Sequence, residues 1–192
     1  MRSVYSPLFI LLAFSCSSDL EVLSIEREKY VNIYHPEFGL IETQDAQIII
    51  GPPEWRLNPE GPPDYKYFKR VTFIMTARGG DPPRDIWLSF TISVPDENQM
   101  TGTYNSSPGF EKPGLSVLAA QMVISNGSNP ELLWSSSQCE ALYPNMQQFP
   151  GVTVTIERQS VSERLAAGFF SLSLCNSDSV FSVSGYFKDI PY

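Results

Sequence analysis

Alternation of apolar and polar residues with a period of two dominates this chain and constrains its fold more than any other feature. In segment 86–94 the apolar members are Ile86, Leu88, Phe90, Ile92 and Val94. Because successive side chains of a β-strand point to opposite faces, this pattern places the apolar set on one face of a strand. Segments 152–157, 170–175 and 181–187 alternate in the same way. Strands that bury one face are typical of antiparallel sheets, so the sequence predicts an all-β fold, a single antiparallel β-sandwich or barrel-like domain.

The apolar faces of these strands are expected to meet in one core. Its predicted members are Leu88, Phe90, Ile92, Val154, Ile156, Leu172, Leu174 and Val183. Shorter β-rich runs come earlier, at residues 22–25, 30–34 and 47–50. Segment 65–77 is long enough to pair with 85–94, and the turn residues of 78–84 would connect the two in a hairpin.

Two stretches are harder to assign. Residues 51–64 carry five of the 16 prolines. Because proline lacks a backbone N–H, we expect a long, stiff surface loop there and not a central strand or helix. Residues 115–125 have apolar residues at helical spacing but β-branched neighbours, so strand and helix stay equally open. No internal repeat or low-complexity linker divides the chain, which indicates one domain.

The first 15 residues are typical of a lipoprotein export signal. They contain the basic Arg2, a short apolar run and the small Ser15 before Cys16. The run is too short to cross a bilayer, which needs about 20 apolar residues. We expect cleavage before Cys16, acylation of that residue with chains such as palmitate, and a lipid-anchored β-rich domain over residues 16–192. An ordinary secretory signal or a buried first strand is the alternative.

The charge of the chain excludes two classes of partner. Its net charge is −8, and loss of Arg2 with the export signal would make it −9. Binding to nucleic acid or to an anionic lipid surface needs clustered Lys and Arg. Here the basic residues are scattered, and only Lys69 and Arg70 are adjacent. Neither nucleic acid nor an anionic lipid surface is therefore expected as a partner.

Two cysteines follow Cys16, and an exported protein meets an oxidising compartment. We predict a disulfide between Cys139 and Cys175, closing a loop of about 36 residues, with two free thiols as the alternative. Strand alternation places Cys175 on the polar side of its strand, where a loop over residues 135–139 would cross it. Two thiolates and the single His35 fall short of the four ligands of a zinc site, so no metal or other cofactor is expected.

Catalytic patterns are scarce. A Ser-His-Asp or Cys-His arrangement needs a histidine held against its nucleophile. His35 precedes Pro36 in an expected turn, and we expect an exposed structural histidine. Phosphate-binding loops, His-Glu-x-x-His helices and calcium loops do not occur in the sequence. A pair of carboxylates could serve a glycan-acting hydrolase, but no carboxylate has an apolar setting, and the chain is predicted not to be an enzyme.

Tryptophans are the candidate ligand contacts. A solvent-facing indole offers a large rigid surface that stacks on a sugar ring or enters a protein groove. The three candidates are Trp55, Trp87 and Trp134. They favour a non-catalytic binding module for a glycan or an envelope protein. Packing of the indoles under loops is the alternative, and it would favour a structural envelope component without a small ligand.

Short sequence motifs in the C-terminal half of the chain are similar to those of a known protein family. They are Gly102-Thr103-Tyr104, residues 150–156, Gly168-Phe169-Phe170-Ser171-Leu172 and residues 183–192. With these motifs the chain resembles small lipoproteins of Bacteroidota of unknown activity, over roughly residues 85–192 and the export signal. It differs in having Gly-Phe-Phe-Ser-Leu where Gly-Thr-Phe-Ser-Phe is commoner. The resemblance implies a β-sheet lipoprotein of the bacterial outer membrane, on its periplasmic or cell-surface side. It also implies O-glycosylation at Ser179, within Asp178-Ser179-Val180, with a plain turn as the alternative.

Overall fold

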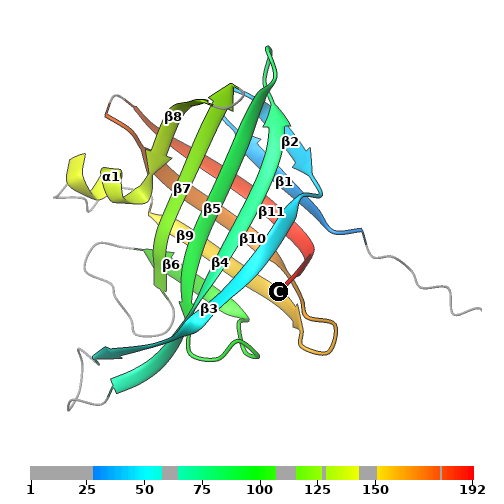
Figure 1. The fold of residues 1–192 in the computed structure, drawn as a ribbon, viewed down its shortest axis with the longest axis vertical. Coiled ribbons are helices and arrows are strands. Elements are labelled where there is room, and N and C mark those ends of the chain that lie inside the picture. The colour runs from blue at the N-terminus through cyan, green and yellow to red at the C-terminus, as the bar shows by residue number, and fades with distance from the viewer. Residues whose placement is uncertain (1–27, 58–64, 107–115, 127–128, 143–150, 178) are drawn as a thin grey trace, which may run out of the picture.

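A computed structural model describes most of the chain after residue 27. The described residues are 28–57, 65–106, 116–126, 129–142, 151–177 and 179–192, and the side chains of 54–57, 65–67, 116, 126, 129–131, 140 and 141 are not among the described features. The elements of this part are β1 (Tyr30–His35), β2 (Gly39–Thr43), β3 (Ala46–Leu57), β4 (Tyr65–Gly79), β5 (Arg84–Val94), β6 (Gly102–Ser106), β7 (Ser116–Asn126), β8 (Asn129–Ser135), α1 (Ser136–Leu142), β9 (Val152–Ser160), β10 (Leu165–Cys175) and β11 (Val180–Pro191) (Figure 1).

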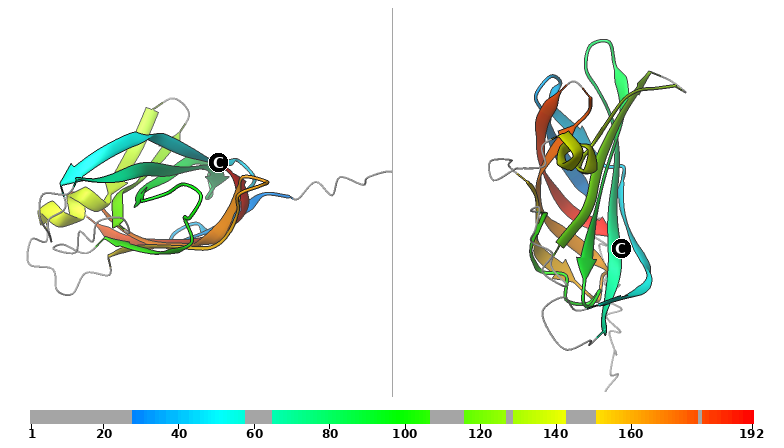
Figure 2. Two further views of the ribbon diagram at one scale, coloured as in Figure 1. Left: turned by 90° about the horizontal axis from the view of Figure 1, so that it is seen from below. Right: turned by 90° about the vertical axis from the view of Figure 1, so that its left-hand side faces the viewer.

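The strands form one sheet that is folded over into two layers (Figure 2). The first layer has the strand order β8-β7-β5-β4-β3, and the second layer has the order β2-β1-β11-β10-β9-β6. Neighbouring strands within each layer are antiparallel, and the layers join through one parallel bridge from Asn105 to Ser116 and one antiparallel bridge from Ser135 to Cys175. Within the described residues, the end strands β2 and β3 do not pair, so the sheet is not closed into a barrel. The predicted all-β, antiparallel, sandwich-like fold is confirmed.

The predicted hairpin is present, because β4 and β5 pair antiparallel with Ala77 opposite Ile86. In the stretch 115–125, left open between strand and helix, residues 116–125 belong to strand β7. The expected surface loop is wrong for residues 51–57, which continue β3 past a bulge between Ile50 and Pro53. Proline is tolerated there because β3 is an edge strand and one side of its backbone needs no partner. Segments 22–25 and 58–64 lie outside the described residues.

The core lies between the two layers. Every residue predicted for it is buried: Leu88, Phe90, Ile92, Val154, Ile156, Leu172, Leu174 and Val183. At its centre four phenylalanine rings connect the layers. Phe73 and Phe90 of the first layer stack at 4.7 Å between centroids, Phe73 lies 5.2 Å from Phe187, and Phe90 lies 5.3 Å from Phe170. Such contacts add to the free energy gained by removing the rings from water.

Two glycines permit this packing by letting other atoms approach the backbone. A Cβ at Gly185 would lie 2.4 Å from a ring carbon of Phe170 and 2.2 Å from the carbonyl oxygen of Asn32. A Cβ at Gly168 would lie 2.0 Å from the carbonyl oxygen of Thr155, next to a bulge in the pairing of β9 and β10. The glycines of the Gly-x-Phe patterns therefore have a steric role.

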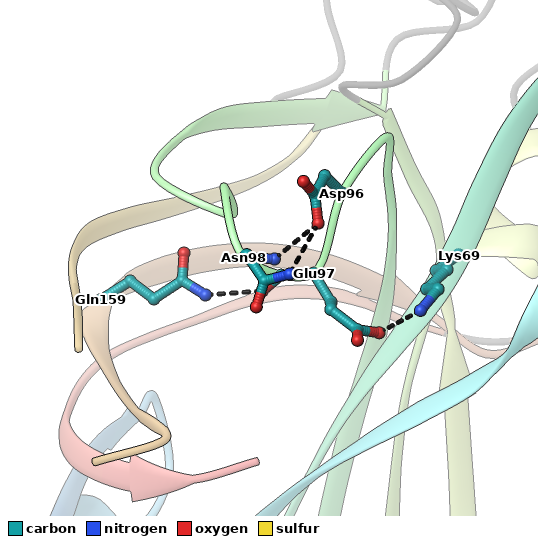
Figure 3. Close-up of polar contacts among 5 residues, drawn as sticks. All are labelled: Lys69, Asp96, Glu97, Asn98 and Gln159. Atoms are coloured by element: carbon teal, nitrogen blue, oxygen red, sulfur yellow. Dashed lines mark hydrogen bonds and ion pairs between the residues drawn. The ribbon is translucent and has the colours of Figure 1, made fainter. Parts of the chain in front are cut away.

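One end of the sandwich is closed by the loop of residues 95–101 between β5 and β6 (Figure 3). Met100 of this loop is fully buried, and Gln159 of β9 holds the loop through two bonds. Its Oε1 accepts from the Met100 N–H at 2.7 Å, and its Nε2 donates to the Glu97 carbonyl at 2.6 Å. Lys69 of β4 pairs with the Glu97 carboxylate, and the buried Tyr104 hydroxyl donates to the Met100 carbonyl at 2.7 Å.

Aromatic side chains close the opposite end. Trp134 meets Phe181 edge to face at 5.0 Å, Phe181 lies 5.2 Å from His35, and His35 stacks on Phe38 at 4.4 Å. The expectation of an exposed His35 is wrong: the residue is 5% exposed. It ends β1, where its ring stacks on Phe38 and its Nδ1 accepts backbone N–H groups of the turn that follows. Side chains of the described residues thus help to close both ends of the sandwich.

Candidate functional site

The tryptophans do not gather in one place. Trp134 belongs to the core and is 7% exposed, and its Nε1 donates to the Ser179 hydroxyl at 3.2 Å. Trp87 lies on the outer face of the first layer, opposite Thr76 of β4. Trp55 lies in β3, and its side chain is outside the described part. Trp87 and Trp134 therefore occupy opposite sides of the first layer, and Trp134 supplies packing.

The cysteine pair forms the predicted disulfide, with 5.0 Å between the Cα atoms of Cys139 and Cys175. Cys175 is on the outer side of its strand, as the alternation predicted, but it is fully buried because α1 covers it. The segment expected to cross as a loop is this helix, which begins where the Ser135 hydroxyl accepts the Gln138 N–H at 3.2 Å. Cys16 lies outside the described residues.

The remaining sequence candidates have defined surroundings. Ser179 is exposed, and its hydroxyl donates to Oδ1 of Asn176 at 2.9 Å. Asp178 lies outside the described part, and O-glycosylation stays a prediction. Nδ1 of His35 accepts the N–H groups of Glu37 and Phe38 at 3.1 and 3.3 Å, which fixes the turn between β1 and β2. Burial lowers the pKa of His35, and the neighbouring Glu37 carboxylate opposes this effect.

Two further findings, on metal ligands and on membrane-spanning helices, concern the described residues. No group of three or more His, Cys, Asp and Glu side chains among them is arranged to hold a metal ion. Within the same residues, no helix has the length and apolar character needed to cross a lipid bilayer.

The outer side of the second layer carries an unexpected concentration of aromatic side chains, which we call the aromatic face. It consists of Tyr30 and Tyr34 of β1, Tyr186 of β11 and Phe169 of β10. The inward neighbours of these residues are buried, so the rings must point outward. Tyr34 is 52% exposed and Phe169 is 42% exposed, and the rings of Tyr30 and Tyr186 are 6.0 Å apart.

Strand register aligns the aromatic face with polar side chains. One row runs across the layer from Glu42 through Asn32, Tyr186, Phe169 and Thr155 to Thr103. A parallel row runs from Leu40 through Tyr34, Ser184, Ser171 and Thr153 to Asn105. Because adjacent strands are about 4.8 Å apart, each row spans roughly 24 Å. The face thus alternates rings with hydroxyl and carboxamide groups.

A hollow of about 310 Å³ adjoins the aromatic face beside Tyr30. Its other lining residues are Glu28, Glu42, Thr43 and Gln44. Nearby, burial raises the pKa of Tyr186, and the Glu157 carboxylate adds to the shift, so this phenol keeps its proton at neutral pH and can donate a hydrogen bond. The hollow and the rings together offer apolar surface and both acceptors and donors of hydrogen bonds.

Comparison of the chain with known protein families, with curated proteins and with solved structures gives no match. What the chain does must therefore be inferred from its surfaces.

Sequence reasoning concentrated on tryptophan and missed the aromatic face. The signal was present, because Tyr30 and Tyr34 alternate with the buried Val31 and Ile33. What the sequence lacked was the order of the strands. β11 lies between β10 and β1, which is far from both in the chain, and this strand order brings the rings onto one surface.

Proposed function

We propose that this chain is a lipid-anchored bacterial envelope protein that binds a neutral glycan, without catalysis, at its aromatic face. The observation that carries the proposal is the set of exposed and half-buried rings that share the outer face of the second layer with hydroxyl and carboxamide side chains. Sugars are amphipathic in the same way, with C–H faces that stack on rings and hydroxyls that form hydrogen bonds. Tyrosine suits this task because it is rigid and carries a polar group on an apolar ring.

Hydrogen-bonding capacity on the aromatic face also supports a hydroxylated ligand. Oδ1 of Asn32, which lies opposite Tyr186, is buried and has no hydrogen-bond partner within the described part of the chain. An unpaired buried acceptor costs about 1 to 3 kcal/mol, and a ligand hydroxyl would recover part of this cost if the Asn32 side chain rotated outward on binding. Carboxylates at Glu28 and Glu42 would accept further hydroxyls and repel anionic glycans.

The anchor is a second part of the proposal. The export signal before Cys16, the resemblance to lipoproteins of Bacteroidota and the disulfide all support an exported, acylated protein of the outer membrane. Disulfides persist in oxidising compartments outside the cytoplasm, so the pair Cys139–Cys175 is consistent with this location.

A polysaccharide pull-down tests the glycan proposal. The purified protein is incubated with insoluble cellulose and with soluble xylan, mixed-linkage β-glucan and starch on affinity gels. We expect retention by at least one of them. The double variant Tyr186→Ala, Phe169→Ala should lose most of this retention, whereas Leu133→Ala, which truncates an equally exposed side chain on the first layer, should keep it. Failure of all probes would favour a protein partner or a structural envelope component, and unchanged retention by the double variant would refute the site.

Mass spectrometry of the mature N-terminus tests the anchor. We expect an acylated Cys16, and Cys16→Ser should release the protein from membranes. An unmodified, soluble N-terminus in the native host would contradict the lipoprotein proposal while leaving the glycan site untouched.

A further inference from the structure

A second hollow, of about 360 Å³, lies on the first layer, on the opposite side of the molecule from the aromatic face. We call it the tryptophan hollow, and its lining residues are Asp45, Thr76, Ala77, Asp85, Ile86, Trp87 and Ser125. They come from β4, β5 and β7, which lie side by side in Figure 1, and from the turn between β2 and β3. The volume is at the lower end of the range for small-molecule sites.

Trp87 supplies the aromatic surface of this hollow. Its neighbours Ile86 and Leu88 are buried, so the indole must lie on the outer face, where it is half-buried. The register places it between Thr76 of β4 and Val123 of β7. Cross-strand neighbours on one face are close enough to contact a large ring, so the indole has a supported position.

Carboxylates lie near the indole from two directions. Asp85 precedes Trp87 by two residues in β5 and therefore shares its face. Asp45 approaches from the turn, and it is fixed there, because its carboxylate accepts the Thr76 hydroxyl and its carbonyl accepts the Thr76 N–H at 2.9 Å. Thr43 completes the support, because its hydroxyl accepts the Asp45 N–H at 3.0 Å.

Arg78 is a cation near Asp85, and it is weakly held. Nε of Arg78 lies 3.8 Å from Oδ1 of Asp85, and the two side chains are 73% and 57% exposed. Exposed pairs at this distance are screened by water and contribute little, so a competing cation can displace Arg78. The net charge of −8 attracts cations to the protein as a whole.

We propose that the tryptophan hollow binds a primary alkylammonium group, either the end of a lysine side chain or a free diamine. The ammonium group would lie over the indole face and pair with Asp85, while its apolar stem would lie along the edge of Trp87. An indole face attracts a cation through its ring electrons, and a carboxylate beside it adds direct charge attraction. This site is distinct from the aromatic rings of the glycan site, which lie on the other layer, although Thr43 and Gln44, next to Asp45 in the chain, line the hollow beside Tyr30.

Titration with matched probes tests this proposal on the full chain. The cation probes are 1,5-diaminopentane and the peptide acetyl-Ala-Lys-Ala-amide, and pentane-1,5-diol is the neutral probe of equal length. The readout is the indole N–H signal of Trp87 in NMR spectra, assigned by its loss in Trp87→Phe. We expect both cations to shift this signal with saturation and the diol to leave it in place. A preference for the peptide would identify a lysine side chain as the source, and a preference for the diamine would identify a free amine.

Substitutions test which side chains of the tryptophan hollow contribute to binding. Asp85→Asn should weaken 1,5-diaminopentane binding by about fivefold to tenfold, and raised salt should weaken it as well. The exposed Glu163 lies in the turn before β10, and Glu163→Gln should bind as the wild type does. Equal shifts with the diol, or equal affinity in Asp85→Asn, would overturn the proposal. The double variant Tyr186→Ala, Phe169→Ala tests the glycan site. Its loss of glycan retention would not change the expected binding of 1,5-diaminopentane to the tryptophan hollow.

Discussion

Single buried polar groups hold the ends of this sandwich. Tyr104 is fully buried, and its burial raises the pKa of the phenol to about 12, so the hydroxyl stays a donor over the whole physiological range. That donor satisfies the Met100 carbonyl, which belongs to the loop that closes the core. The loop is therefore fixed by a group whose loss can be measured.

Replacing Tyr104 by Phe removes this donor and keeps the ring. The Met100 carbonyl would lose its partner, and we expect the free energy of unfolding to fall by about 1 to 3 kcal/mol. Urea unfolding at pH 7 measures this change. Tyr34→Phe, which alters an exposed hydroxyl, should change stability by less than about 0.5 kcal/mol. Equal unfolding midpoints for Tyr104→Phe and the wild type would contradict the role of this bond.

His35 makes stability depend on pH. Burial lowers its pKa in the folded state, so the unfolded chain takes up a proton first as the pH falls. The stability from neutral His35 is fully present above the unfolded pKa of about 6.5 and is lost as the pH falls from there through the lowered folded pKa. Urea unfolding between pH 8 and pH 5 should show this decline, and His35→Asn, which keeps an acceptor near the position of Nδ1, should flatten it. Parallel pH profiles for the two proteins would disprove the assignment.

At the scale of elements, close approach of strands depends on glycine. In Gly185→Ala the new methyl group would collide with Phe170 and with the backbone of β1. We expect a loss of about 1 to 3 kcal/mol in the free energy of unfolding. The neighbouring Ser184→Ala, on the outer face, is the control and should be close to neutral. Thermal or urea unfolding checks both, and a Gly185→Ala protein as stable as the wild type would rule out tight packing at this position.

The disulfide attaches α1 to the second layer. A helix of seven residues is not stable alone, so α1 depends on this bond and on its packing. The double variant Cys139→Ala, Cys175→Ala should lose about 2 to 4 kcal/mol. Hydrogen exchange should rise in residues 136–142 before it rises in β5. Two free thiols in the unfolded, unreduced protein would show that the bond does not form.

Many of the strands could be predicted from the alternation of apolar and polar residues alone. The β4–β5 hairpin and the core set follow from a period of two, because each strand buries one face. Helix α1 was missed although Ser135 and Gln138 have the spacing of a helix N-terminal capping box. The helix is short, and its sequence shows no helical period of apolar residues unless Cys139 is known to pack against Cys175. The extension of β3 through Pro52 and Pro53 depends on its being an edge strand, which a local pattern does not reveal.

At the scale of the whole molecule, topology creates the sites. Each layer has an outer face assembled from strands distant in the chain, with β1 beside β11 in one layer and β5 beside β7 in the other. Folding over puts the aromatic face and the tryptophan hollow on opposite sides. The two proposals therefore assign a glycan to one side of the protein and a cationic group to the other.

The most direct test of the glycan proposal is an NMR titration of isotope-labelled protein with oligosaccharides from the polysaccharide that retains it. The account predicts saturable shifts of the backbone amides of Asn32, Phe169 and Tyr186, with the Trp87 indole signal unmoved. Shifts confined to the first layer, or none with any oligosaccharide, would contradict it.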